Sequence, residues 1–339
     1  MPTDWPHEAQ LVVEEFLDKH AADVDRTGRL PREHLDELAR RGFYGLVTSE
    51  GITPDALIDT ASTLIGGCLT TGFVWAQHIG ALRSVAWGAN SALRERYMAR
   101  MQAGDYRCGV SYAGARSAPT LFAQRSGTGD FIVSGTAPFV TGWGYIDAVA
   151  TAVRVREEAG ESVATLLIPV QDAEGLSAEP LPLIAADASS TVRLTFDHTV
   201  VDAALAIDSK PVSALRGGTP AATDWFNGVL SLGVLSRCVR ELKTLDAESA
   251  AAHEARCAQL RARFTPALGD EHATYALRAD LARAGLDAAA AVAVATGSTA
   301  TTVHSTAERL LRQATFALVC TTRDPIKIAL LQQLTPPTP

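Results

Sequence analysis

Four polar side chains near the start of one C-terminal helical segment, residues 304–320, have types that could do chemistry. They are His304, Glu308, Arg309 and Arg312. Glu308 is a candidate catalytic base, because a carboxylate beside a substrate carbon can remove a proton. Arg309 and Arg312 suit phosphate groups, since a planar guanidinium matches the geometry of phosphate oxygens. The alternative is a solvated helix face, on which Glu308 and Arg312 form an ordinary i,i+4 ion pair.

Two further places along the chain offer candidate functional groups. His78 lies in the apolar helical phrase 75–80 and could act as an acid or base, although a lone histidine on such a helix is also typical of a structural residue. Arg116 and Ser117 lie in a loop and could contact a phosphate or a polar ligand chain. The alternative for this pair is exposed loop residues without a ligand.

Composition excludes several classes of function. The net charge of −8 argues against nucleic acid as the main partner, because phosphate backbones bind basic surfaces. The first residues lack a signal-peptide pattern, and no apolar run is long enough to span a bilayer. Five scattered cysteines without CxxC spacing, and histidines without HxxxH or HExxH spacing, predict no metal site and buried thiols in a reducing cytoplasm.

The pattern of hydrophobic residues divides the chain into three regions. Helical spacing runs to about residue 105, with glycine stops at Gly42 and Gly104. Short β-type runs follow at 106–112, 121–125, 131–134, 147–156, 163–170 and 191–197. Residues 127–130 between two of them predict a hairpin.

Helical spacing returns from about residue 221 and continues to about residue 320. We therefore predict an N-terminal helical domain (1–105), a central antiparallel β-barrel or sandwich (106–210) and a C-terminal helical bundle (211–339). The absence of βαβ alternation and of a GxGxxG phrase excludes a Rossmann nucleotide site.

Four phrases in this order resemble the acyl-CoA dehydrogenases. Residues 34–46 resemble the family's early helix end, and 108–114 stand where its β domain begins with Thr-Glu-Pro. Residues 131–141 resemble the phrase that ends Trp-Ile-Thr, and 192–201 resemble the strand that closes the β domain. The resemblance implies FAD as cofactor and an acyl thioester, of CoA or a carrier protein, as substrate.

The resemblance also assigns roles to particular residues. Tyr112 and Ala113 would contact the pyrimidine side of the flavin, Phe139 would replace the stacking Trp, and Thr141 would keep a hydroxyl near the ring. Trp143, between two glycines, would face the flavin or the substrate, or else fill a turn at a domain interface. The resemblance also implies that His78 lies on a helix that lines the substrate pocket. With FAD and an acyl thioester as ligands, Arg309 and Arg312 are candidates to hold FAD or CoA phosphates, and Arg116 and Ser117 to contact a phosphate or pantetheine.

The sequence departs from the family pattern in three places. Thr-Glu-Pro has become Ala113-Gly114-Ala115, the Arg-Phe-Gly segment is missing after Arg240, and no Glu stands in the family's catalytic phrase. His78 and Glu308 are the only candidate replacements for the base. Three functions therefore stay open: desaturation of an acyl thioester, flavin-dependent monooxygenation, or a degenerate subunit that has lost part of its FAD site. We expect a homodimer or homotetramer, or a hetero-oligomer in the degenerate case.

Overall fold

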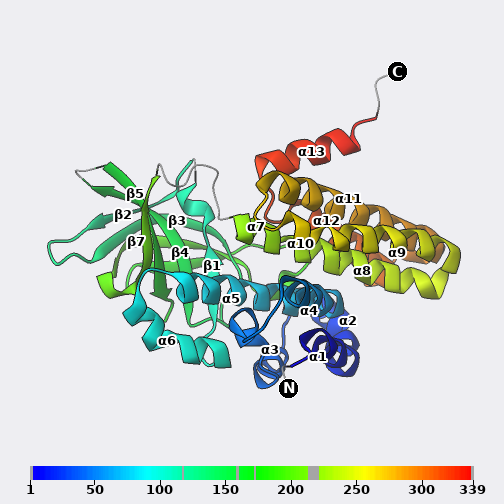
Figure 1. Cartoon of the computed structure of the whole chain (residues 1–339), viewed down its shortest axis with the longest axis horizontal. Helices are drawn as coiled ribbons and strands as arrows, with labels where there is room; N and C mark the ends of the chain where they lie inside the picture. The colour runs from blue at the N-terminus through cyan, green and yellow to red at the C-terminus, as the bar shows by residue number, and fades with distance from the viewer. Residues whose placement is uncertain (1–2, 117, 158–159, 172, 213–220, 337–339) are drawn as a thin grey trace.

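The computed structural model describes residues 3–116, 118–157, 160–171, 173–212 and 221–336. Helices come first, then strands, then helices again, as Figure 1 shows from blue through green to red. This order confirms the predicted fold class. Across the described ranges, no helix is both long and apolar enough to cross a bilayer.

The N-terminal helices surround one buried helix, α5. The elements are α1 (Trp5–Val12), a π-helical stretch η1 (Val13–Leu17), α2 (Asp18–Thr27), α3 (Arg32–Arg40), a 3-10 helix η2 (Phe43–Thr48), α4 (Pro54–Gly67), α5 (Leu69–Trp87) and α6 (Ser91–Ala103). Apolar side chains lie all around α5, which is typical of a helix inside a core. The indole of Trp75 is fully buried on α5 and donates a hydrogen bond of 3.1 Å to the carbonyl of Phe43.

Eight strands form one mixed sheet. They are β1 (Cys108–Ser111), β2 (Leu121–Arg125), β3 (Phe131–Val140), β4 (Ala148–Glu157), β5 (Gly160–Pro169), β6 (Leu176–Pro180), β7 (Val192–Val201) and β8 (Ala206–Pro211). Their order is β6-β7-β3-β2-β4-β5-β8, and β1 pairs with β4. The predicted turn at 127–130 does join two antiparallel strands, β2 and β3.

The predicted antiparallel barrel is wrong in two details. Strands β1 and β2 both run parallel to β4, so the sheet is mixed. Among the described residues no pairing joins the end strands β6 and β8, so the sheet stays open. The sequence did not indicate these details because β6 and β8 are short strands with few buried side chains, and alternation along a strand says nothing about the direction of its neighbour.

The C-terminal helices form a bundle against the N-terminal helices. The elements are α7 (Ala221–Phe226), α8 (Gly228–Leu245), α9 (Ala247–Ala262), α10 (Phe264–Ala267), α11 (Glu271–Thr296), η7 (Gly297–Thr301), α12 (Thr306–Val319) and α13 (Asp324–Leu334). Helix α8 packs against both α11 and α4. At its crossing with α4, a Cβ on Gly233 would lie 2.6 Å from a methyl carbon of Ile65, so only glycine permits this close approach.

Candidate active site

A cavity of about 1600 Å³ lies between the sheet and the C-terminal helices. Strands β4, β5 and β8 line it on the sheet side, and the last turns of α5 line it on the N-terminal side. The C-terminal helices contribute α7, the start of α11 and the residues around the start of α13. Because all three parts of the fold line this cleft, a ligand bound in it would contact each of them.

Tyr112 connects the end of β1 to helix α5 inside the cleft. Its hydroxyl and the Oγ of Ser84 are 2.8 Å apart, and both residues line the cavity. Burial raises the pKa of Tyr112, so the phenol stays protonated and neutral at ordinary pH. The indole of Trp87, one turn further along α5, lines the same cavity and is 65% exposed.

A buried carboxylate, Asp224 on α7, lies behind the cleft and organises its C-terminal wall. Its Oδ1 accepts a hydrogen bond of 3.1 Å from Nε of Arg323 and lies 3.6 Å from Nη1 of Arg278. The Tyr275 hydroxyl is 3.5 Å from Oδ2 of Asp224 and donates to Oε1 of Glu271 at 2.5 Å. Burial lowers the pKa of Arg278 to about 10 despite the neighbouring Asp224, so this guanidinium is still charged at neutral pH.

Three further basic side chains line the cleft. Arg83, half-buried on α5, donates a hydrogen bond to Oγ1 of Thr223 on α7. Arg154 is 9% exposed on β4 and donates to the carbonyl of Arg116 at 3.0 Å, which fixes the backbone after β1. Burial lowers the pKa of Arg116, and the positive charge of nearby Arg323 lowers it further. Several guanidiniums therefore converge near Thr223 and Asp224.

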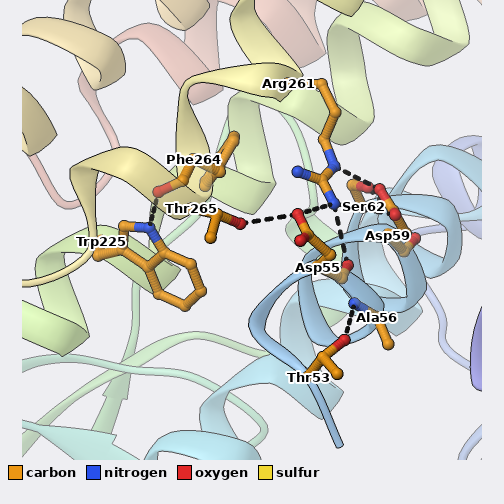
Figure 2. A network of polar contacts seen from close by, with 9 residues as sticks. All are labelled: Thr53, Asp55, Ala56, Asp59, Ser62, Trp225, Arg261, Phe264 and Thr265. Carbon is orange, nitrogen blue, oxygen red and sulfur yellow. Dashed lines mark hydrogen bonds and ion pairs between the residues drawn. The ribbon is translucent and has the colours of Figure 1, made fainter.

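A second polar network holds α7 in place from behind, as Figure 2 shows. The indole of Trp225, next to Asp224, donates a hydrogen bond of 2.7 Å to the carbonyl of Phe264. The following residue, Thr265, donates to Asp55 on α4 at 2.7 Å, and Arg261 donates to the same carboxylate at 2.8 Å. These bonds tie α7 to α10 and the C-terminal helices to α4.

Solved structures with this architecture were found over almost the whole chain. The glutaryl-CoA dehydrogenase complex with glutaryl-CoA has a TM-score of 0.83 and 16% identity, and the match covers 97% of this chain and 94% of that one. Butyryl-CoA dehydrogenase from Megasphaera elsdenii has a TM-score of 0.84 and 12% identity, and the match covers 98% of each chain. The FAD complex of PigA has a TM-score of 0.82 and 16% identity, and the match covers 98% of this chain and 96% of that one. No family profile matches the sequence, and the comparison with curated proteins finds no significant match.

The protein has the acyl-CoA dehydrogenase fold. Identities of 12 to 16% establish the fold, whereas the residues of the cleft must be judged one by one. The resemblance seen in the sequence phrases is therefore confirmed as a resemblance of architecture.

Within this acyl-CoA dehydrogenase fold, the residues expected to face a flavin follow β1 and end β3. Tyr112 lies in the cleft, and Ala113 begins the short 3-10 turn after it. Phe139 lies where the β3–β7 pairing shifts register, has a φ of 54° and is 63% exposed. Thr141 is buried, 3.0 Å from the hydroxyl of Thr191, and Trp143 is half-buried with its backbone N–H bonded to the carbonyl of Ser190.

His78 lies inside the core instead of lining the cleft. Its Nε2 contacts the carbonyl of Met101 at 3.0 Å, and its Nδ1 accepts a hydrogen bond of 3.1 Å from the backbone N–H of Cys108. Burial lowers its pKa to about 3, so the ring is neutral. With both ring nitrogens occupied by backbone groups, His78 joins α5 to α6 and β1, and the geometry supports a structural role.

The candidate residues of α12 lie away from the cleft, against α2. Arg312 bonds Glu308 and, at 2.5 Å, Asp25, and it also donates to the carbonyl of Ile184 at 2.9 Å. Both partners are carboxylates, so Arg312 has little capacity left for a phosphate. Arg309 is buried, and its Nη1 has no hydrogen-bond partner among the described residues. Of the predicted substrate pair, Arg116 lines the cleft, whereas Ser117 lies outside the described residues.

Several residues of the cleft were not predicted from the sequence. Arg83, Asp224, Tyr275 and Arg323 come from four different elements, so no local spacing could indicate that they meet. For Arg83, the sequence offered one indication: it lies five residues after His78 on the same predicted helix. A shift of five residues changes the helix face, so Arg83 reaches the cleft while His78 faces the core.

Proposed function

We propose that this protein is an FAD-dependent oxidoreductase that acts on an acyl thioester bound in the cleft. The observation that carries the proposal is the position of Tyr112, expected beside a flavin, in a cavity of about 1600 Å³ that basic side chains also line. The fold supports it, since one similar structure is a complex with FAD and another a complex with glutaryl-CoA. A cavity of this size can hold a ring system together with a substrate chain.

The residues at the end of β3 fit a flavin ring. Phe139 presents an aromatic ring that is 63% exposed, from a backbone with a φ of 54°. A planar ring would cover Phe139 by stacking, and the backbone of Tyr112 and Ala113 could bond its polar edge. FAD, when bound, supplies an acceptor for the electron pair that leaves the substrate. The engaged Arg312 does not fit a role in holding the FAD phosphates within the same chain.

The chain's own groups would bind and orient the substrate. The phenol of Tyr112, kept neutral by burial, and the hydroxyl of Ser84 offer hydrogen bonds to a carbonyl or thioester. Trp87 offers an apolar face to the chain of the substrate. The guanidiniums would attract an anionic ligand.

Three of the four carboxylates that line the cleft, all except Asp324, are engaged by other groups of the protein, and this favours a second candidate, a flavin-dependent monooxygenase. Glu271 is bonded by the Tyr275 hydroxyl, and Asp208 pairs with Lys210 at 2.8 Å. Asp270 caps α11 by accepting a hydrogen bond from the backbone of Ala273. Desaturation needs a carboxylate that can take a proton from the substrate, whereas oxygen chemistry on a reduced flavin does not. We therefore expect desaturation of ordinary acyl-CoA esters to be slow.

The experiment begins with purified protein incubated with FAD and freed of excess flavin. A retained flavin absorbance band is expected, and its absence would overturn the proposal in favour of a degenerate subunit. The loaded protein is then mixed without oxygen with butyryl-CoA and glutaryl-CoA. Rapid bleaching would support the dehydrogenase. No bleaching, together with oxygen consumption that requires a flavin reductant, would support the monooxygenase.

Assembly and location follow the same proposal. We propose a homodimer or homotetramer that works in the cytoplasm, as expected from the sequence. The sequence spacing of four apolar residues on α8 predicts one apolar helix face for the bundle and the subunit contact, but the structure buries this face. Leu230, Leu232, Leu235 and Val239 are all at most 7% exposed, within the chain's own helical bundle.

A further inference from the structure

Guanidiniums from three parts of the chain gather at one end of the cleft, around α7. Arg83 bonds Thr223 on α7, and Arg116 lies near Arg323 and Asp224. Arg278 and Arg323 are both within ion-pair distance of Asp224. Asp224 therefore already has two guanidinium partners before Arg83 and Arg116 are considered.

Arg83 and Arg116 are the two guanidiniums without an acidic partner in the described part of the chain. Arg83 bonds the neutral hydroxyl of Thr223, and burial lowers its pKa. The Arg116 side chain makes no ion pair with a described residue, although nearby Arg323 repels it and nearby Asp224 attracts it. Both side chains line the cleft. Arg83 is half-buried without a counterion, which is unfavourable, and an anion in the cleft would remove that penalty. Arg116 is exposed beside the same cleft and can contact the same anion.

The acidic side chains that line the cleft do not supply this anion. Asp208 pairs with Lys210, Asp270 caps α11, and Glu271 accepts from Tyr275. Asp324 lies in the first turn of α13, where the helix dipole favours a carboxylate. Across the described residues, none of these four carboxylates lies within ion-pair distance of Arg83 or Arg116, although they share the cavity with them.

We propose that Arg83 and Arg116, with Arg323 beside them, form a binding site for an anionic group of the substrate, a carboxylate or a phosphate. This site rests on the proposed function in one respect: the anion is taken to be part of the acyl thioester substrate. Guanidiniums bind both groups through paired, charge-assisted hydrogen bonds. Asp224 positions Arg323 for this contact through the 3.1 Å hydrogen bond to its Nε, which leaves the terminal nitrogens of Arg323 to face the ligand.

Four thioesters separate the two sources of the anion. Butyryl-CoA has phosphates but no acyl carboxylate, and the glutaryl thioester of N-acetylcysteamine has the carboxylate but no phosphate. Glutaryl-CoA has both, and the butyryl thioester of N-acetylcysteamine has neither. Calorimetric titration of the full-length protein gives a Kd for each ligand without any turnover. We expect the ligands that carry the recognised anion to bind about tenfold or more tightly than the neutral one.

Variants then test the arginines. Arg83→Gln and Arg116→Gln should each raise the Kd of the anionic ligands about tenfold and leave that of the neutral thioester unchanged. Arg83→Lys keeps the charge and should retain part of the affinity. Arg29→Gln, on the exposed surface before α3, is the matched control and should change nothing. If the variants bind the glutaryl thioester of N-acetylcysteamine more weakly, the arginines recognise the acyl carboxylate. If they bind butyryl-CoA more weakly but not that thioester, the arginines recognise a phosphate of CoA.

Three results would overturn the inference: no preference for an anionic ligand, an equal loss for all four thioesters in the variants, or no saturable binding of any of them. The outcome is separable from that of the proposed function. Arginine-dependent anion binding by protein that retains no flavin would keep this site and reject the oxidoreductase. Flavin reduction by butyryl-CoA or glutaryl-CoA, together with Kd values for the anionic thioesters that Arg83→Gln and Arg116→Gln leave unchanged, would keep the oxidoreductase and reject this site.

Discussion

The carboxylate of Asp224 accepts a hydrogen bond of 3.1 Å from Nε of Arg323, and this contact joins α7 to the residue that precedes α13. The Asp224 side chain is 1% exposed and that of Arg323 is 11% exposed, so both charges lie largely out of water. A buried charge is tolerated only with its partner. The place of Arg323 in the cleft therefore depends on Asp224.

Replacing Asp224 by Asn should destabilise the protein strongly. The change would leave Arg278 and Arg323 without their shared counterion, and breaking a buried pair in this way costs about 3–5 kcal/mol. Urea denaturation measures the free energy of unfolding. The control is Asp287→Asn, because Asp287 forms an exposed i,i+4 pair with Arg283 and should contribute less than about 1 kcal/mol. Equal losses in the two variants would contradict the buried network.

The protein should become less stable as the pH falls, because His78 is buried in its neutral form. Burial lowers its folded pKa to about 3, against an ordinary value of 6.5. Between these values the unfolded chain binds a proton that the folded chain does not, so stability is complete above 6.5 and is lost as the pH falls toward 3. His78→Gln should reduce this slope, which for one group reaches about 1.4 kcal/mol per pH unit. His34, with a folded pKa of about 4, acts in the same direction and leaves a residual slope.

Denaturation curves at several pH values measure this dependence. The exposed His7 provides the comparison, since His7→Gln should leave the slope unchanged. An unaltered slope in His78→Gln would show that His78 is not the buried neutral group described above.

Phe139→Ala should lower the amount of FAD retained after purification. The ring is 63% exposed, so its removal costs little folding energy, within about 1 kcal/mol, while a stacking surface for the flavin is lost. The absorbance ratio of flavin to protein is the measurement. Val200→Ala removes a side chain that is 67% exposed on the neighbouring strand β7 and should not alter flavin content. Equal flavin content in both variants and the wild type would place the ring elsewhere.

Subunit contacts should involve the exposed side of α13. Ile328 and Leu331 on this helix are 56% and 54% exposed, although Ile326 and Leu330 on its other side are buried. Leu331→Glu should reduce the mass measured by light scattering without changing the urea midpoint, because a charge at an apolar contact opposes association. Leu235→Ala, in the bundle core, should instead lower stability by about 2–5 kcal/mol. A wild-type monomer, or an unchanged mass in Leu331→Glu, would refute this contact.

The sequence predicted the order of elements well, because each helix and most strands carry their own periodic signal. The stop at Gly104, the turn at 127–130 and the return of helical spacing near residue 221 all correspond to element ends in the structure. The short strands β6 and β8 and the helix α13 were missed. Their side chains are mostly exposed, so burial leaves little periodic pattern in them.

What the sequence determined by itself was local: which segments are helices or strands, and that Tyr112 and Phe139 belong to phrases like those of a known flavoprotein fold. The tertiary structure alone decided which charges meet. Glu308 and Arg312 look like catalytic or phosphate-binding groups until Asp25, almost three hundred residues away in sequence, is seen to occupy Arg312. Asp224 and Arg323 have no local pattern at all, yet they form the wall of the cleft. Contacts between distant elements depend on how helices pack, and the spacing of residues along one segment contains no information about them.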